Sequence, residues 1–396
     1  MTKDEIFESY QQYILPTYTR IPAIFVKGKG STLIDISGKK YLDFFPGWGV
    51  NNVGHCHPKV MAAVRDQIDK LIHIPNNLYH PHQAKLAKEI IQASFPGKVF
   101  FGNSGAEAAE GAIKLSRAYG AKTKRFEIIT MQKSFHGRTM GALSATGQPK
   151  HQEGFEPLLP GFKTIPFNDL NALKAAITPQ TIAIMFELVQ GEGGINIADK
   201  NYVQEIRKIC DEKNILLIFD EVQTGMGRTG EMFGFKHYNV VPDVMMLAKA
   251  LGGGLPIGAL VVGEKFTDVL KPGMHASTFG GSPLVCKASL GVFKAIQADK
   301  MLKNTKKMGS YLVEKLGPLK QKFNCILEVR GIGLMVGIQL NIEGKNIIDD
   351  CFQQGLIINC TQGNVLRVMP ALNITKKQID KAVGILDKVL ENITQK

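Results

Sequence analysis

The sequence predicts an α/β protein: a large domain with a mostly parallel central sheet flanked by helices, and a smaller α+β domain. Three observations lead to this fold class. Short apolar runs alternate with helical patterns between residues 98 and 248, which is typical of parallel strands connected by helices. The runs are apolar throughout, as in strands buried on both faces. The chain of 396 residues also exceeds what one hydrophobic core usually covers, so we expect two unequal domains.

The first part of the chain predicts a helix, three strands and a long loop. Residues 4–14 fit a short amphipathic helix, and residues 24–45 fit three short strands joined by tight turns. The stretch GWGVNNVGHCHP (47–58) is rich in glycine and asparagine, so we expect a loop there. Pro58 suits the first turn of a helix that reaches about Ile72.

The central part of the chain predicts the strands of the large sheet. These predicted strands are KVFF (98–101), FEIIT (126–130), IAIMF (182–186), ILLIF (215–219) and VMMLA (244–248). A helix is expected from about Ser104 to Tyr119, because its small and apolar residues keep to one face. Helical stretches between most of the runs would cover the sheet.

The pattern changes after about residue 295, where we expect the smaller domain. Two charged helical stretches come first, and short strands and a last helix follow. The predicted strands lie near 325–339 and 356–369, and the predicted helix covers about 375–391. The predicted domains are an N-terminal segment (1–57) that packs with the small domain, a large domain (58–295) and a C-terminal small domain (296–396).

Composition and charge narrow the classes of function. The net charge of +13 comes from 48 basic and 35 acidic residues spread along the chain, which favours small anionic ligands, or no role for the charge, over nucleic acid. No apolar stretch approaches the ~20 residues that span a bilayer. The start, MTKDEIFESY, has no secretory signal core, and the six cysteines form no CxxC pair. We therefore expect a cytoplasmic protein without a membrane partner.

The strongest candidate site lies in residues 215–254. Two apolar runs in this stretch end in Asp220 and Lys249. The carboxyl ends of parallel strands form the edge at which open α/β sheets bind ligands. An acid and a lysine at this edge could hold opposite sides of one small molecule, and the glycines at 252–254 would leave room for it.

The motif FGNSGAEAAEGA (101–112) reads as a strand end, a turn and a helix start. Free N–H groups at Ser104, Gly105 and Ala106 could bind a phosphate at the positive end of the helix dipole. The same residues also fit an ordinary helix start in which Ser104 and Glu107 form a capping box. The motif alone leaves both interpretations open.

The glycine motif GMGRTG (225–230) matches the GxGxxG pattern of dinucleotide-binding proteins. That pattern needs a helix that begins within the glycines. The sequence that follows, EMFGFKHYNVVP, is too rich in glycine and aromatic residues for a helix. We therefore interpret the motif as a loop and disfavour a nicotinamide cofactor.

Two loop motifs have weaker signals. His55, Cys56 and His57 resemble a metal cluster, but no second cluster stands at a ligand spacing, so we expect no metal site. Phe135 and Arg138, in FHGR, could meet a planar ring and a carboxylate, or could belong to a surface loop.

Lys249 decides between these possibilities. It ends an apolar run and precedes a glycine stretch, so we expect its ammonium to be partly desolvated and its pKa lowered from ~10.4. Such a lysine is a nucleophile for carbonyl groups and forms Schiff bases. With Asp220 to hold a pyridinium nitrogen and the turn at 104–106 to hold a phosphate, the predicted cofactor is pyridoxal 5'-phosphate.

At this point the residues resemble a known family. The resemblance is to the class III aminotransferases of pyridoxal-phosphate fold type I, and within them to the acetylornithine-type enzymes. It extends from about residue 14 to the C-terminus, in long motifs in the same order. The matching motifs are NSGAEAAEGA (103–112), FHGRT (135–139), VQGEGG (189–194), DEVQTGMGRTG (220–230), LAKALGGGLPIGA (247–259) and STFGG (277–281).

The resemblance implies roles in cofactor binding. It makes Lys249 the Schiff-base lysine and proton carrier, and Asp220 the partner of the pyridine nitrogen. It also implies that Thr278 reaches the phosphate from the neighbouring subunit of a homodimer. The other cofactor-binding residues that it implies are Ser104, Gly105 and Ala106 at the phosphate, Phe135 on the ring face and Gln223 at the phenolic oxygen.

The resemblance also implies how substrates bind. Arg367 would hold the α-carboxylate of glutamate or 2-oxoglutarate, and Glu192 would pair with it when an ω-amine is bound. Arg138 would take the carboxylate of that amine. The implied reaction is a ping-pong transfer of the δ-amino group of N-acetylornithine to 2-oxoglutarate, which gives N-acetylglutamate 5-semialdehyde and glutamate, in arginine biosynthesis.

Two departures from the family pattern concern the substrate. Trp48 stands where ornithine aminotransferases carry a tyrosine, and Ala276 replaces a glycine that is common before STFGG. The first departure disfavours free ornithine. Ornithine, 4-aminobutyrate and N-succinyl-diaminopimelate remain alternative donors, and a nicotinamide-dependent dehydrogenase or a basic nucleic-acid-binding module remain alternatives of other classes.

Overall fold

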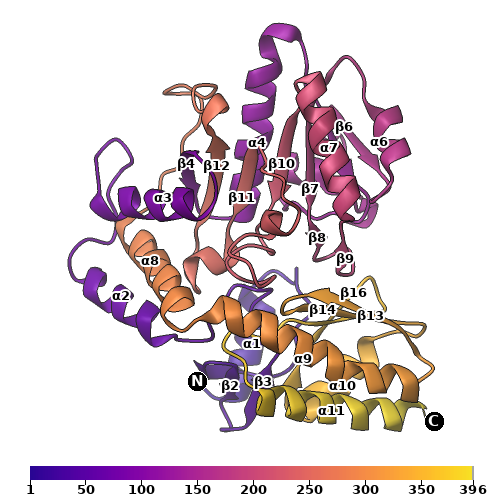
Figure 1. Ribbon diagram of the computed structural model, residues 1–396. Coiled ribbons are helices and arrows are strands. Elements are labelled where there is room, and N and C mark those ends of the chain that lie inside the picture. Colours follow the sequence, from indigo (N-terminus) through magenta and orange to yellow (C-terminus); the bar gives the residue numbers. More distant parts are fainter. Residues whose placement is uncertain (395–396) are drawn as a thin grey trace.

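The computed structural model describes residues 1–394 and contains a seven-stranded sheet, two four-stranded sheets and one two-stranded ribbon (Figure 1). The strand order of the large sheet is β4-β12-β11-β10-β7-β5-β6. Its strands are β4 (Gly97–Gly102), β5 (Glu127–Met131), β6 (Phe162–Ile165), β7 (Thr181–Glu187), β10 (Leu216–Asp220), β11 (Val244–Leu247) and β12 (Gly258–Gly263). Only β12 runs against its neighbours, so the predicted fold class is confirmed.

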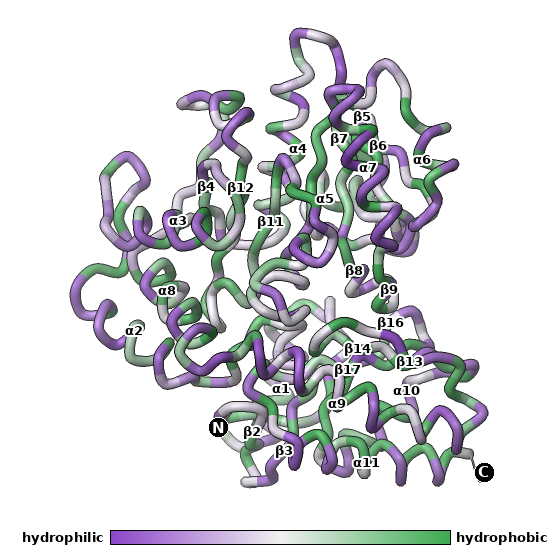
Figure 2. Tube along the Cα trace, viewed as in Figure 1, coloured by the Kyte–Doolittle hydropathy of each residue, from purple (hydrophilic) through white to green (hydrophobic). Residues whose placement is uncertain are grey.

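Both faces of the large sheet are buried, because successive side chains of a strand point to opposite faces. In β10, Leu216 and Ile218 belong to one hydrophobic core, and Leu217 and Phe219 belong to the other. Figure 2 shows that the strands of this sheet are mainly hydrophobic. The uninterrupted apolar runs in the sequence therefore reflect burial on both sides, as predicted.

Helices cover the two faces of the large sheet. The core on one face includes residues of α4 and α5, and the core on the other face includes residues of α3, α7 and α8. These helices are α3 (Pro81–Ala93), α4 (Gly105–Gly120), α5 (Met140–Ala145), α7 (Lys200–Lys213) and α8 (Pro283–Ala298). The helix α6 (Leu170–Ala176) lies at the β6 edge (Figure 1), and α2 (Pro58–Ile68) packs against α8.

The two smaller sheets lie together below the large sheet (Figure 1). One, ordered β1-β2-β3-β15, joins the N-terminal meander to a C-terminal strand, and the other is ordered β13-β14-β17-β16. Their strands are β1 (Phe25–Lys29), β2 (Thr32–Asp35), β3 (Lys40–Asp43), β13 (Ile326–Ile332), β14 (Met335–Leu340), β15 (Leu356–Ile357), β16 (Asn359–Thr361) and β17 (Val365–Val368). The accompanying helices are α9 (Met301–Lys322), α10 (Lys345–Gln353) and α11 (Lys376–Thr394). The remaining ribbon pairs β8 (Val189–Gln190) with β9 (Asn196–Ile197).

Several elements differ from the sequence-based expectations. The helix that starts at Pro58 ends at Ile68, before the predicted Ile72. The strands β6 and β12 and the helix α3 were not predicted. The boundary drawn at residue 295 falls inside α8, which packs against α2 and α3. The domain division into 1–57, 58–295 and 296–396 stays a prediction, and residues 395–396 lie outside the described part.

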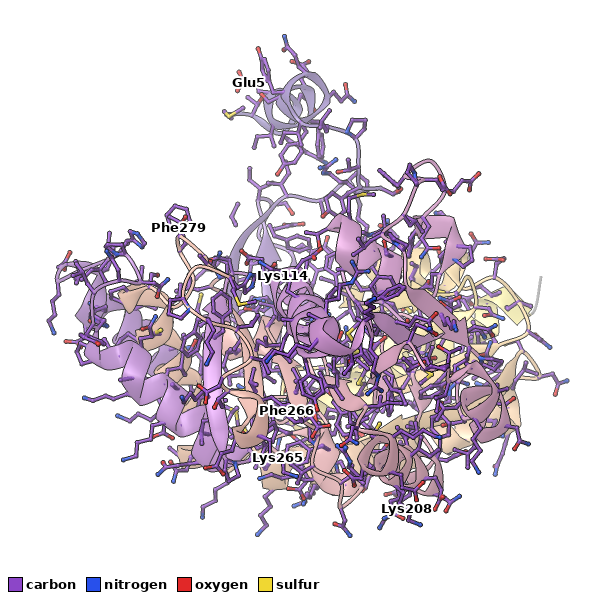
Figure 3. All side chains as sticks on the ribbon, turned by 90° about the horizontal axis from the view of Figure 1, so that it is seen from above. Glu5, Lys114, Lys208, Lys265, Phe266 and Phe279 are labelled. Carbon is purple, nitrogen blue, oxygen red and sulfur yellow. The ribbon has the colours of Figure 1, made fainter. Side chains whose placement is uncertain are left out.

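The N-terminal helix α1 (Lys3–Tyr13) forms as predicted but contacts little of the protein. Thr2 and Glu5 form a reciprocal capping box, which satisfies two of the free N–H groups at the helix start. No residue of α1 is buried, and the helix that carries Glu5 stands away from the body in Figure 3. Within residues 1–394, no helix is long and apolar enough to cross a membrane.

The GMGRTG motif forms a loop, as predicted, and its arginine has a structural role. Arg228 is fully buried, and its guanidinium donates to the carbonyl oxygens of Leu334 (2.8 Å) and Pro370 (2.6 Å) and to Oδ1 of Asn52. Gly227 and Gly230 have φ of 89° and 93°, which only glycine adopts without strain. The loop therefore ties the N-terminal segment and the C-terminal sheet to the large sheet.

We expect Arg228→Met to lower the free energy of unfolding by about 2–4 kcal/mol, because buried acceptors lose their donors. The measurement is the urea midpoint of the purified protein. Arg20→Met, on an exposed arginine, is the control and should leave the midpoint unchanged. Equal midpoints for the two variants would contradict the anchoring role.

Candidate active site

A cavity of about 470 Å³ opens at the carboxyl edge of the large sheet. In the register of the sheet, Asp220 at the end of β10 pairs with Glu187 at the end of β7 and with Met246 of β11. Lys249 follows Met246 by three residues, so all the charged groups reach the same edge. The cavity lining includes Ser104, Gly105, Ala106, Phe135, His136, Arg138, Glu187, Glu192, Asp220, Gln223 and Lys249.

Lys249 lies directly after β11, where it begins a short 3-10 turn. Its φ of 43° is in the left-handed region, which costs a non-glycine residue about 1–2 kcal/mol and often marks a functional position. Burial lowers the pKa of Lys249, although the carboxylates of Glu192 and Asp220 act in the opposite direction. The predicted desolvated lysine is therefore present in the cavity.

Asp220 belongs to a buried charge cluster. Its Oδ2 lies 2.7 Å from Nδ1 of His136, and its Oδ1 accepts a hydrogen bond from the Val222 N–H at 3.0 Å. Burial alone lowers the pKa of His136, but the hydrogen bond and charge of Asp220 and the charge of Glu187 outweigh it, so the pKa is raised. His136 therefore fixes the position of the Asp220 carboxylate inside the protein.

Glu187 is the third member of this cluster. Burial, followed by the charge of Asp220, raises its pKa. Its carboxylate accepts hydrogen bonds from the N–H groups of Phe135 (2.8 Å) and Gly191 (2.9 Å). Glu187 thus fixes two loops that border the cavity.

The start of α4 supplies an anion site. The Ser104 hydroxyl caps the helix by accepting a hydrogen bond from the Glu107 N–H. The Glu107 carboxylate accepts a hydrogen bond from the Asn103 N–H. In a full capping box it would accept from the Ser104 N–H instead. Within residues 1–394, the N–H groups of Gly105 and Ala106 have no hydrogen-bond partner. These free N–H groups at a helix N-terminus fit a phosphate.

Buried polar atoms without partners show that the cavity suits a polar ligand. Among the described residues, Oε1 of Gln223 and Nε2 of His136 are buried and make no hydrogen bond. Buried polar groups are rarely left unsatisfied, so a bound molecule is expected to meet them. A phosphate site, a lysine, a carboxylate and an unsatisfied amide oxygen around one cavity match the groups of pyridoxal phosphate.

Arg367 and Glu192 form the ion pair that the resemblance implied. Nη1 of Arg367 lies 2.6 Å from Oε1 of Glu192, and Nη2 lies 3.1 Å from Oε2. Only 1% of Arg367 is exposed, and its guanidinium also stacks on the Phe45 ring at 4.6 Å. Burial by itself raises the pKa of Glu192, but Arg367 reverses this effect and the pKa is lowered. Glu192 lines the cavity, and Arg367 lies behind it.

Arg138 belongs to the cavity wall itself and is exposed. Its Cζ lies 5.4 Å from the centroid of the Phe135 ring. The cavity is therefore bordered by an exposed guanidinium, and a second guanidinium lies behind Glu192, with which it is paired.

Three predicted site residues do not line this cavity in the described chain: Arg367, which pairs with Glu192 behind the lining, and the exposed Trp48 and Thr278. Trp48 is 49% exposed, has a φ of 56° and packs edge-on against Phe45 at 5.9 Å. Thr278 lies on an exposed loop beside Phe279, which projects from the body in Figure 3. The folded subunit alone does not bring these two residues to the cavity.

The position of Glu187 in this cluster was not predicted from the sequence. Its signal was present, because Glu187 directly follows the apolar run of β7 just as Asp220 follows that of β10. His136 was noted in the FHGR loop, but its contact with Asp220 joins residues 84 apart in sequence and has no local signal.

The two histidines of the HCH motif have carboxylate partners. Nε2 of His55 lies 2.7 Å from Asp43, and Nε2 of His57 lies 2.9 Å from Asp299. No group of three or more potential metal ligands occurs in residues 1–394.

Comparison with known proteins shows the family. Residues 13–390 match the family described as Aminotransferase class-III. The chain is 51% identical to the acetylornithine aminotransferase of Methanocaldococcus jannaschii over 99% of this chain and 100% of that protein. It is 50% identical to the acetylornithine aminotransferase of Caldanaerobacter subterraneus over 97% of this chain and 98% of that protein.

A solved structure agrees with these relatives. The ornithine aminotransferase of Toxoplasma gondii, crystallized with oxidized glutathione and with partial occupancy of pyridoxal phosphate at its active site, superposes with a TM-score of 0.96. It is 31% identical and covers 100% of this chain and 95% of its own. The chain therefore belongs to the class III aminotransferase family and is a pyridoxal-phosphate-dependent aminotransferase, which confirms the cofactor and the reaction type predicted from the sequence.

Proposed function

We propose that this aminotransferase moves the δ-amino group of N-acetylornithine to 2-oxoglutarate, in arginine biosynthesis. The products are N-acetylglutamate 5-semialdehyde and glutamate. The observation that carries the proposal is the pair of arginines at one cavity, Arg138 exposed and Arg367 closed by Glu192. The acetylornithine aminotransferases at 51% and 50% identity support the donor.

The proposed cofactor-binding residues surround the cavity. The N–H groups of Gly105 and Ala106, with Ser104, would hold the phosphate, and the unsatisfied Oε1 of Gln223 would meet a ring substituent. Phe135 would cover one face of the ring. Asp220, held in place by His136, would keep the ring nitrogen protonated, because a nearby carboxylate favours the positively charged form of that nitrogen.

The proposed catalytic residue is Lys249, which would take the proton from the amine-bearing substrate carbon as a base and then, as an acid, deliver a proton to the carbon of the cofactor's carbonyl group. Burial lowers the pKa of Lys249, and this direction favours the neutral amine that the step needs. Pyridoxal phosphate, when bound, supplies the carbonyl that takes up the amino group and a ring that accepts electrons. Lys249 lines the cavity, and the charges of Glu192, Asp220 and Glu187 act on its amino group there.

The two arginines would let one cavity serve two substrates. With the Glu192–Arg367 pair closed, only Arg138 offers a positive charge, which suits an acylated amine with one carboxylate. When Glu192 moves aside, Arg367 offers a bidentate fork to the α-carboxylate of 2-oxoglutarate, and Arg138 takes the other carboxylate. This alternation matches a ping-pong cycle.

We also propose that the protein works as a homodimer in the cytoplasm. The loop that carries Thr278 and Phe279 is exposed on the single chain and does not reach its own cavity, so a second subunit is the expected contact. Phe279 is 61% exposed and Tyr79 is fully exposed, as apolar residues at an interface would be in an isolated subunit. In the described chain the cysteines are free, which suits a reducing compartment.

The proposed donor is tested by comparing N-acetylornithine, ornithine, 4-aminobutyrate and N-succinyl-diaminopimelate with 2-oxoglutarate as acceptor. We expect kcat/KM to be highest for N-acetylornithine, because Trp48 replaces the tyrosine expected for free ornithine. A higher kcat/KM for any other donor in the panel would overturn the proposed substrate and leave the family unaffected.

For the catalytic role, we expect Lys249→Ala to reduce kcat by about 10²–10⁴-fold, the usual contribution of a positioned general base. The same variant should lose the yellow chromophore that borohydride reduces in the parent enzyme. Lys265→Ala, on an exposed lysine, is the control and should keep both properties. Full turnover in Lys249→Ala would remove this residue from the mechanism.

The role of Thr278 is tested in mixed dimers of one Lys249→Ala subunit and one Thr278→Ala subunit. If Thr278 serves the neighbouring site, one site of the mixed dimer keeps both residues, and cofactor affinity and turnover return at that site. If Thr278 serves its own site, both sites stay defective. We expect the first result, with about half of the parent turnover per dimer, by simple counting of intact sites.

A further inference from the structure

Arg367 is held from two sides by acceptors of different kinds. It lies on β17 directly opposite Asn359 of β16. Oδ1 of Asn359 accepts from Nε at 2.8 Å and from Nη2 at 2.5 Å. The Glu192 carboxylate occupies the other edge, and the Gly191 carbonyl accepts from Nη1 at 3.1 Å. These five hydrogen bonds account for all five N–H groups of the guanidinium.

The two sides differ in charge and in freedom to move. Asn359 is neutral and belongs to a strand whose backbone pairs with that of Arg367. Glu192 is anionic, lies in a loop, and reaches Arg367 only through its side chain. When a substrate carboxylate binds Arg367, it would therefore replace the Glu192 carboxylate, and the hydrogen bonds to the Asn359 amide would remain.

The backbone of Glu192 is itself fixed to the same small sheet. Its carbonyl oxygen accepts from Oγ1 of Thr361 at 2.6 Å and from Nε2 of Gln362 at 2.8 Å. Gln362 also donates to Oε1 of Gln148 at 3.1 Å, which ties this turn to the wall of the large domain. Opening of the Glu192–Arg367 pair is thus a side-chain rotation about a fixed backbone.

We propose that Asn359 is the positioning residue that keeps the Arg367 guanidinium aimed at the cavity while Glu192 is displaced. The inference rests on the proposed function, in which Arg367 receives the α-carboxylate of 2-oxoglutarate. A neutral acceptor suits this task, because it orients the fork without neutralising the charge that the incoming carboxylate needs. An aspartate at the same position would hold the fork equally well but would compete with the substrate for that charge.

Two substitutions test the two parts of this inference. Asn359→Ala removes the acceptor of two Arg367 hydrogen bonds, and we expect KM for 2-oxoglutarate to rise about tenfold, equivalent to ~1.4 kcal/mol. Asn359→Asp keeps the acceptor geometry and adds a charge, and KM for 2-oxoglutarate should again rise about tenfold or more. In both variants KM for N-acetylornithine should change less than about twofold, because the amine binds while the pair is closed.

The control is Asn364→Ala, which removes a hydrogen bond to the Leu340 carbonyl in the same sheet without contact to Arg367. We expect it to lower the melting temperature about as much as Asn359→Ala and to leave both KM values unchanged. Glutarate, a dicarboxylate that cannot react, provides a binding readout besides turnover. In the Asn359 variants its affinity should fall as KM for 2-oxoglutarate rises.

Each outcome has a defined meaning. Unchanged glutarate affinity and 2-oxoglutarate KM in Asn359→Ala, or an equal rise of both KM values, would overturn the positioning role. Absence of N-acetylornithine turnover in the parent enzyme would instead overturn the proposed function. The two failures are separate, because glutarate binding to the parent enzyme is measured independently of the donor.

Discussion

The parallel pairing of β7, β10 and β11 is the constraint on which the candidate site depends. It brings Glu187 and Asp220 to adjacent strand ends and places Lys249 one short turn beyond the third strand. Burial at this edge raises the pKa of Glu187, with the charge of Asp220 acting in the same direction, and lowers the pKa of Lys249 against the opposing effect of the carboxylates. The register of a buried sheet thus determines the chemistry available at its edge.

Charge in the cavity is divided into a permanent part and a switchable part. His136 holds Asp220 through a buried contact between two side chains. Arg367 is instead compensated by Glu192, whose side chain also faces the cavity. Because a buried guanidinium without a partner is costly, the ion pair stays closed until another carboxylate replaces Glu192. The displaceable Glu192 side chain would therefore let one site bind both the acylated amine and the dicarboxylate 2-oxoglutarate, which differ in charge.

Much of the site was predictable from the sequence because its signals are local. Asp220 and Lys249 each end an apolar run, and Ser104 stands at a turn before a helix, so periodicity alone located them. The contacts of His136, Asn359 and Arg228 were not predictable in this way, because each depends on pairing between distant segments. The reversed strand β12 was missed for a similar reason, since strand direction is set by connections and not by composition. Trp48 and Thr278 stay predictions, because the single chain does not bring them to the cavity.

In the proposed mechanism, the Glu192–Arg367 ion pair opens when 2-oxoglutarate binds and stays closed when the amine binds. The most direct measurement is a pair of crystal structures of the holoenzyme, one with glutarate and one with an unreactive N-acetylornithine analogue. We predict that glutarate displaces Glu192 and binds Arg367, with the Asn359 contact retained, and that the ion pair stays closed with the amine analogue. An ion pair that is closed in both complexes, or open in both, would contradict the account.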